Sequence, residues 1–203
     1  ETDAKGRLVL PGGTDAHAHI EQLPAAGIVN ADTFESATTA AAFGGTTTAI
    51  CFAAQHRGGN LMKVVDDYMG LAKKGAVIDY TLHLIIADPT EITLKEHVPG
   101  LVAQGHPTLK VFMTYDLLNV GDEKLLEILL AARQNKALVC VHAENHGMVS
   151  WMGKKLVEKG YLAPKYHTIS HPRGCEAEAI NRLITFAGLI DQPIMVFHVS
   201  TAE

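Results

Sequence analysis

The sequence predicts an α/β protein in which helices cover a parallel sheet. Apolar or β-branched segments alternate with helical segments along the 203-residue chain. The repeat is roughly 30 residues, the usual length of a strand–helix–strand unit. The expected strands are apolar throughout, as in parallel sheets that are buried on both faces. No G-x-G-x-x-G or Walker-type sequence follows any of them, which weighs against a nucleotide-binding fold.

Local signals define six strand–helix repeats. The strand segments are short runs rich in apolar and β-branched residues, and the helical segments carry apolar residues three and four positions apart. The strands are expected at residues 8–10, 46–50, 77–86, 108–113, 137–141 and 194–199, the helices at residues 34–43, 61–75, 94–103, 123–134, 148–159 and 176–190, and a polar loop at residues 160–173.

Capping residues mark both ends of the first helix. Asp32, followed three residues later by Glu35, is typical of a capping box that begins a helix. Gly44 and Gly45 are typical of a helix end, because glycine adopts the left-handed conformation found there. These signals place the helix at residues 34–43.

Composition limits the classes of partner. The net charge is −5 and no basic stripe is present, which argues against nucleic acid. No apolar run approaches the ~20 residues that span a bilayer, so no membrane partner is expected. Three separated cysteines, Cys51, Cys140 and Cys175, indicate buried free thiols and a reducing, cytoplasmic location. Because the first residue is Glu1 and not Met, the natural N-terminus is expected upstream.

Four histidines fall where strands are expected to end. His17 and His19 follow the first strand, and residues two apart in an extended segment face the same side. His142 and His198 end the fifth and sixth strands. A lone histidine at such a position is usually structural, and an H-x-H sequence is common by chance. Four of them at the carboxyl ends of three strands instead predict a metal site, because barrel active sites form there.

The shared metal site also bears on the architecture, since an open doubly wound sheet and a (β/α)8 barrel both fit the alternation. Strands lie about 4.7–4.9 Å apart, so a flat sheet in chain order would separate the first and sixth strands by over ~20 Å. A closed barrel brings them together, although a reordered open sheet could do so too. We predict a (β/α)8 TIM barrel, present in residues 1–203 as roughly its first six units and incomplete at both ends.

Two further side chains have both a structural and a functional interpretation. Lys110 lies in the middle of an apolar strand, where a charge is unfavourable unless it is paired or modified. It could reach the barrel mouth or pair with a carboxylate, or it could be carbamylated and so become a metal ligand. Tyr115 could pack on the barrel rim, or its hydroxyl could donate to a developing oxyanion. Outside these positions, His56 could line the pocket mouth. The histidines interpreted as structural are His83, His97, His106, His146, His167 and His171.

Five blocks of sequence carry a family resemblance. They are residues 11–19 (PGGTDAHAH), 43–48 (FGGTTT), 109–115 (LKVFMTY), 141–145 (VHAEN) and 198–200 (HVS). In order and spacing they resemble the dihydropyrimidinase/hydantoinase branch of the amidohydrolase superfamily, over nearly the whole chain.

The resemblance implies a centre with two zinc ions. His17 and His19 would bind the more buried metal, and His142 and His198 the more exposed one. Lys110, as a carbamate, would bridge the two. All five residues are present at the matching positions, which favours an enzyme over a non-catalytic scaffold relative that has lost its metal ligands.

The resemblance also implies a reaction. A hydroxide between the metals would attack the ring amide of a small cyclic substrate, and Tyr115 would help to hold the carbonyl oxygen. The expected substrates are 5,6-dihydropyrimidines or 5-substituted hydantoins, which would open to N-carbamoyl amino acids; an allantoinase or dihydroorotase-like cyclic amidohydrolase is the alternative. The family's last ligand, an aspartate that is also the general base, is expected beyond Glu203, and relatives are commonly homotetramers.

Overall fold

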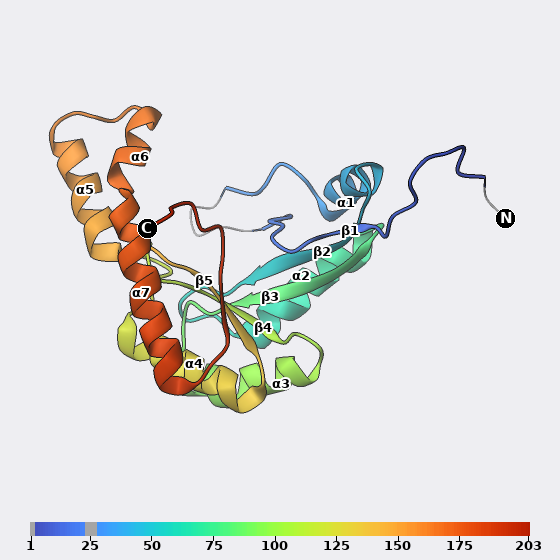
Figure 1. The fold of residues 1–203 in the computed structure, drawn as a ribbon. Coiled ribbons are helices and arrows are strands. Elements are labelled where there is room, and N and C mark those ends of the chain that lie inside the picture. Colours follow the sequence, from blue (N-terminus) through green and yellow to red (C-terminus); the bar gives the residue numbers. More distant parts are fainter. Residues whose placement is uncertain (1–2, 23–27) are drawn as a thin grey trace. The chain divides into compact units, whose positions relative to one another are not determined.

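Parallel strands form the framework of the structure, a computed structural model that describes residues 3–22 and 28–203 (Figure 1). Within these residues the strands are β1 (Gly13–Asp15), β2 (Thr46–Ala54), β3 (Asp79–Ile85), β4 (Thr108–Phe112), β5 (Leu138–His142) and β6 (Ile194–Val196). They follow one another in chain order, and β1–β2, β3–β4, β4–β5 and β5–β6 pair in parallel. This confirms the predicted α/β class, with the order of successive units in a (β/α)8 barrel.

A helical segment follows each of the first five strands. These segments are α1 (Phe34–Phe43), α2 (Leu61–Gly75), a π-helical turn η1 (Thr93–His97), α3 (Val98–Ala103), α4 (Asp122–Asn135), α5 (His146–Glu158), a 3-10 turn η2 (Pro164–Tyr166), α6 (His167–Ser170) and α7 (Arg173–Ile190). The prediction of a polar loop at residues 160–173 was wrong in part, because η2 and α6 lie within it. Pro164 begins η2, where a missing N–H is tolerated.

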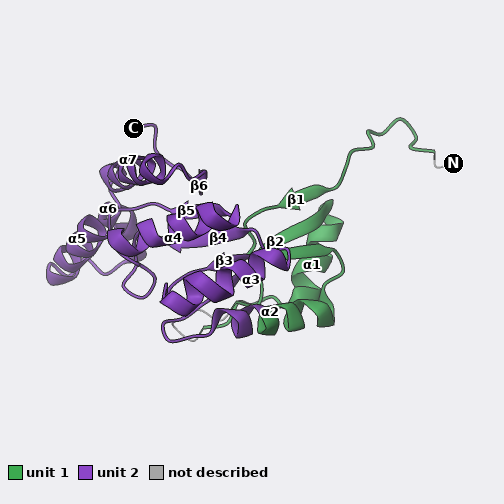
Figure 2. Ribbon diagram, turned by 90° about the horizontal axis from the view of Figure 1, so that it is seen from below, with its two compact units in different colours: residues 1–52, 66–82 green, residues 53–65, 83–203 purple. Residues whose placement is uncertain are grey.

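The described chain divides into two compact units (Figure 2). Unit 1 consists of Glu1–Phe52 and Asp66–Leu82, and unit 2 of Ala53–Val65 and His83–Glu203. Strands β2 and β3 each run through both units, so the division falls within strands and not at a linker.

In unit 1, the first helix has the predicted bounds but a different cap. Thr33 is the N-cap: its hydroxyl accepts from the Ser36 amide at 3.3 Å, and the Ser36 hydroxyl accepts from the Thr33 amide at 3.1 Å. The predicted box of Asp32 and Glu35 was wrong, because Asp32 lies one residue too early. Its carboxylate instead accepts from the Ser36 hydroxyl at 2.7 Å. The predicted helix end is confirmed, since Gly44 is the C-cap and Gly45 has φ +89°.

The first strand of unit 1 lies later than predicted. Residues 8–10 are apolar but exposed, and β1 begins only at Gly13, whose amide donates to the Gly45 carbonyl at 2.9 Å. At Gly12 the backbone passes so close to the Thr47 side chain that a Cβ atom would collide with it. The strand therefore forms where glycine permits the close approach to β2, not where the sequence is most apolar.

Unit 2 contains a close-packed core between β4, β5 and the helices α4 and α7. Its fully buried side chains stabilise the fold by about 1.5–3 kcal/mol each. They include Leu109, Val111, Ile128, Val139, Val141 and Leu183. Lys110 lies between Leu109 and Val111 on β4, so its side chain faces the opposite side of the strand, and it is paired in register with Cys140 of β5. Phe112 pairs with His142 at the carboxyl ends of the same two strands, which places the candidate site at that edge.

Two boundaries of unit 2 differ from the prediction in ways that matter for the site. Strand β6 ends at Val196, so His198 lies in the turn that follows it, with φ +41°. Helix α7 begins at Arg173, which places Glu176 within its first turn.

The expectation of buried free thiols is confirmed. Cys51, Cys140 and Cys175 are all buried and form no disulfide. Over the described ranges, we find no helix with the length and apolar character needed to cross a membrane.

Candidate metal centre

The predicted site residues are divided between the units. His17 and His19 lie in unit 1, and Lys110, Tyr115, His142 and His198 lie in unit 2. Each unit brings its own histidine pair together. Convergence of all five predicted ligands on one cavity stays a prediction.

In unit 1, one aromatic ring orients both histidines. His19 stacks on Phe52 with the ring centroids 4.3 Å apart and the planes 10° from parallel, and the His17 ring lies 4.8 Å from the same phenyl group. The backbone holds the segment, because the His17 amide donates to the Asp15 carboxylate at 2.9 Å. Nδ1 of His19 contacts Oε1 of Gln22 at 2.5 Å, which leaves Nε2 as the ring nitrogen that would face a metal.

In unit 2, His142 at the end of β5 and His198 in the turn after β6 face each other. Nδ1 of His142 lies 3.2 Å from Nε2 of His198. Two nitrogens bound tetrahedrally to one zinc ion at about 2.0–2.1 Å would be roughly 3.3 Å apart. The pair therefore has the separation that a shared metal ion requires.

Glu144 determines which nitrogen of His142 can bind a metal. Its Oε2 lies 2.6 Å from Nε2 of His142, so Nε2 carries the proton and Nδ1 presents a lone pair toward His198. The hydrogen bond from His142 holds the pKa of the Glu144 carboxyl below its usual value, which keeps this acceptor charged. Carboxylates of this kind orient histidine ligands in many metal sites.

Lys110 is buried between aromatic rings. It is 1% exposed, with Nζ 4.4 Å from the centre of the Phe197 ring and 4.7 Å from that of Phe112. The alternative in which the side chain reaches solvent at the barrel mouth is therefore wrong. Burial lowers the pKa of Lys110 to about 7, so a large fraction of the amine is neutral near physiological pH.

Tyr115 lies beside the histidine pair. Its ring centre is 5.1 Å from that of His142, and its backbone has φ +71°, an uncommon conformation for a residue other than glycine. Desolvation, followed by the charge of Glu144, raises the pKa of the phenol, so the hydroxyl remains a proton donor. This is the state in which a tyrosine can donate to an oxyanion.

A cavity of about 260 Å³ in unit 2 is lined by Tyr115, His142, Glu144 and His198. Several of its residues were not predicted as site residues, among them the carboxylates Glu144 and Glu176 and two histidines that had been interpreted as structural, His167 and His171. Glu144 could have been found, because it follows His142 by two residues in an extended segment and so faces the same side. Glu176 carries no local signal. The lining consists of Tyr115, His142, Ala143, Glu144, His167, Thr168, His171, Glu176, His198 and Ser200.

The donor set of each unit fits a metal ion only in part. Among the described residues, no group of three or more histidine, cysteine, aspartate or glutamate side chains is arranged to hold a metal. The fit therefore depends on two histidine pairs, and on a buried lysine that would have to become a carbamate before it could ligate. The separation of the His142 and His198 nitrogens is the observation that favours this fit.

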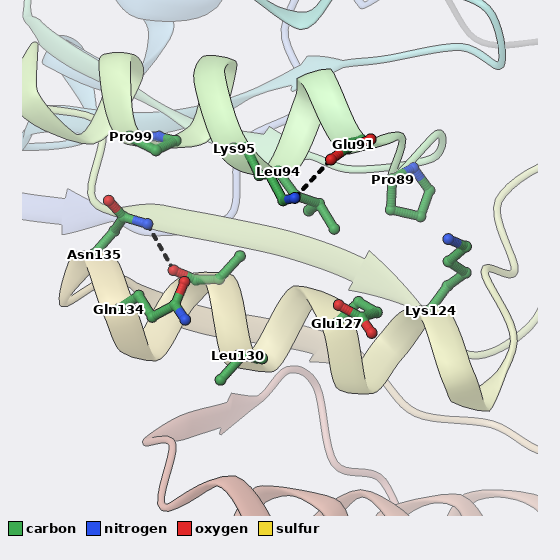
Figure 3. A pocket seen from close by; sticks show the side chains of 11 residues that line it. Pro89, Glu91, Leu94, Lys95, Pro99, Lys124, Glu127, Leu130, Gln134 and Asn135 are labelled. Atoms are coloured by element: carbon green, nitrogen blue, oxygen red, sulfur yellow. Dashed lines mark hydrogen bonds and ion pairs between the residues drawn. The ribbon is translucent and has the colours of Figure 1, made fainter.

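A larger groove on unit 2, about 530 Å³, is not part of this centre (Figure 3). It lies between η1 and α4, and its charged rim includes Lys95, which pairs with Glu91 at 2.6 Å. None of the predicted ligands lines it, and no histidine does.

Comparisons with known proteins agree with the fold and the sequence blocks. The profile of the Amidohydrolase family matches residues 8–194. The chain is 41% identical to a D-hydantoinase from Geobacillus stearothermophilus, over 99% of this chain and 43% of that protein. It is 35% identical to a dihydropyrimidinase from Rattus norvegicus, over 97% of this chain and 38% of that protein.

A solved structure shares the fold as well. The crystal structure of dihydropyrimidinase from Brevibacillus agri superposes with a TM-score of 0.91 at 38% identity, covering 95% of this chain and 42% of the other. The chain thus spans less than half the length of the relatives that it matches. Together with the matching profile, these similarities confirm the resemblance to the dihydropyrimidinase/hydantoinase branch, and the chain belongs to the amidohydrolase family.

Proposed function

We propose that this chain forms the metal-binding part of a hydrolase that opens small cyclic amides. The substrates are 5,6-dihydropyrimidines or 5-substituted hydantoins, and the products are N-carbamoyl amino acids. The observation that carries the proposal is the 3.2 Å separation of Nδ1 of His142 and Nε2 of His198 at adjacent strand ends. Similarity to a D-hydantoinase and a dihydropyrimidinase supports the substrate class.

Five side chains would hold two zinc ions. His17 and His19 would bind one ion, His142 and His198 the other, and Lys110 would bridge them as a carbamate. When bound, zinc ions polarise a carbonyl group and lower the pKa of a water molecule that serves as the nucleophile.

Lys110 would become the bridge by a simple addition. The neutral amine attacks carbon dioxide, a C–N bond forms, and one proton leaves to solvent, which gives an anionic carbamate with two oxygens. The lowered pKa of about 7 supports this role, because only the neutral amine is nucleophilic.

Two further side chains would polarise the substrate carbonyl and position a metal ligand. Tyr115 would donate its hydroxyl proton to the oxygen on which charge develops as the ring amide is attacked. Glu144 would hold the tautomer and the orientation of His142 through the 2.6 Å contact to Nε2. We propose residues 1–203 as a metal-dependent amidohydrolase barrel domain, and, by resemblance to the family, a cytoplasmic homotetramer.

A ring-opening assay tests the proposal. The complete protein, loaded with zinc, is incubated separately with 5-substituted hydantoin, dihydrouracil, allantoin and dihydroorotate, and the N-carbamoyl product is quantified by chromatography. We expect turnover of the first two, which a chelator abolishes. His142→Ala should lose this turnover, whereas His97→Ala, outside the site, should keep it. Turnover of allantoin or dihydroorotate alone would assign the alternative activity, and no turnover of any ring would refute the proposal.

A further inference from the structure

The buried carboxylate of Glu176 accepts hydrogen bonds from the turn that carries His198. Glu176 is 9% exposed in the first turn of α7. Its Oε2 accepts from the Thr201 amide at 2.8 Å, and its Oε1 accepts from the Ser200 amide at 3.0 Å. The Ser200 hydroxyl also donates to Oε1 at 3.1 Å. One side chain thus satisfies three donors of the segment that directly follows β6.

This turn needs external support. His198 has φ +41°, in the left-handed region where a side chain other than that of glycine is strained. Such a conformation persists only where the surrounding structure holds it. The Phe197 amide, which donates to the Val141 carbonyl at 3.0 Å, fixes the chain before His198, and Glu176 fixes it after.

The hydrogen bonds that Glu176 accepts are strengthened by its negative charge. Burial raises the pKa of this carboxyl, but the hydrogen bonds from Thr201 and Ser200 together lower it by more. The pKa therefore lies below its usual value. The group is therefore ionised at neutral pH, and an ionised acceptor forms shorter and stronger hydrogen bonds than a neutral one.

We propose that Glu176 is a positioning residue for His198. Acting through the Ser200 and Thr201 amides, it holds the strained turn so that Nε2 of His198 stays opposite Nδ1 of His142. This deepens the proposed function, on which it rests, because His198 matters here as a ligand of the more exposed metal.

Glu176 is not assigned as a ligand itself. Both of its oxygens are occupied by the two amides and the Ser200 hydroxyl. A side chain that only joins α7 to the end of β6 would affect stability alone. A positioning residue must also affect one metal and not the other.

The experiment compares Glu176→Gln with Glu123→Gln in the complete protein. The amide of glutamine has nearly the same shape, but its nitrogen cannot accept from the turn, whereas Glu123 is exposed on α4 and serves as the matched control. The affinity of each of the two metal sites is measured by cobalt titration against a chelator, with the cobalt absorption spectrum as the geometric readout. The melting temperature of the metal-free protein is measured in parallel.

We expect Glu176→Gln to weaken the second, more exposed metal by about 10–100-fold and to change its cobalt spectrum, the usual effect of removing a group that orients a ligand. The first metal should bind as in the wild type. Ser200→Ala, which keeps both amide donors, should have a smaller effect. If the glutamine variant does not fold, Glu176→Asp decides by the same titration, because it keeps the charge on a shorter side chain.

Two different failures can be told apart. If the wild type binds two metals and Glu176→Gln binds both with unchanged affinity and spectrum, the inference is wrong, even if the melting temperature falls. If the wild type itself binds no metal, or opens no cyclic amide, the proposed function fails before any variant is compared.

Discussion

Gln55 is expected to hold two loops of unit 2 through a single buried amide group. It is 0% exposed at the end of β2. Its Oε1 accepts from the Ala87 amide at 3.2 Å and the Asp88 amide at 3.1 Å, and its Nε2 donates to the Gly59 carbonyl at 2.9 Å. These loops follow the carboxyl ends of β2 and β3.

The loss of stability expected for Gln55→Leu depends on which hydrogen-bond partners of Gln55 are left unsatisfied. Loss of the acceptor would cost about 1–3 kcal/mol for the buried Ala87 amide and about 1 kcal/mol for the partly exposed Asp88 amide. The Thr93 hydroxyl, which also accepts from Nε2 at 3.5 Å, keeps its hydrogen bond to Thr90, and the carbonyl of the partly exposed Gly59 can accept from water, so neither adds to the loss. The apolar leucine offsets about 1 kcal/mol. We expect the free energy of unfolding to fall by about 1–3 kcal/mol.

Urea unfolding of the complete metal-free protein measures this change, and hydrogen exchange of the segment at residues 85–90 locates it. Gln134→Leu, at an exposed position on α4, is the control and should change stability by less than about 0.5 kcal/mol. If Gln55→Leu unfolds and exchanges like this control, the accounting of buried hydrogen bonds is refuted.

Three further predictions concern single side chains. Tyr115→Phe should lower kcat by about 10²–10³ with unchanged metal content, as for the loss of one oxyanion donor; wild-type turnover would remove Tyr115 from the mechanism. Lys110→Ala should lose at least one metal and nearly all activity, and short carboxylic acids should partly restore both; metal analysis showing two ions without added acid would contradict this. Burial lowers the pKa of His106 below its unfolded value, so the unfolded state binds more protons in acid and stability falls as the pH drops below about 6.5. The stability of His106→Leu relative to that of the wild type should therefore rise as the pH is lowered from 7 to 5, and a constant difference in urea titrations would count against it.

The parts of the fold that local chemistry determines could be predicted from the sequence. The helix Phe34–Phe43 was predicted with its observed bounds, because the glycines that end it act within one turn. The first strand was misplaced, because strand formation depends on a partner that is distant in sequence. Gly13 pairs with Thr46, whereas the apolar residues 8–10 pair with no strand among the residues that the structure describes.

The same distinction explains which site residues were found. The histidines were found because their positions relative to strand ends are visible in the sequence. Glu176 was missed because its partner Ser200 lies 24 residues away, and only the structure brings a helix start against a strand end. His171 was interpreted as structural for the same reason, although it lines the cavity with His142.

Aromatic packing connects the chemistry of Lys110 to the geometry of the histidines. Phe197 directly precedes His198, and its ring covers Nζ of Lys110 while the turn at His198 directs the imidazole toward His142. The Phe112 ring also contacts Nζ of Lys110, and its centre lies 5.5 Å from that of the His142 ring. The rings exclude water from the amine, and this desolvation shifts it toward the neutral form. A metal ligand must be deprotonated before it binds, and so must an amine that reacts with carbon dioxide. The side chains that fix the positions of the proposed ligands in unit 2 therefore also set the protonation state of the lysine, before any metal arrives.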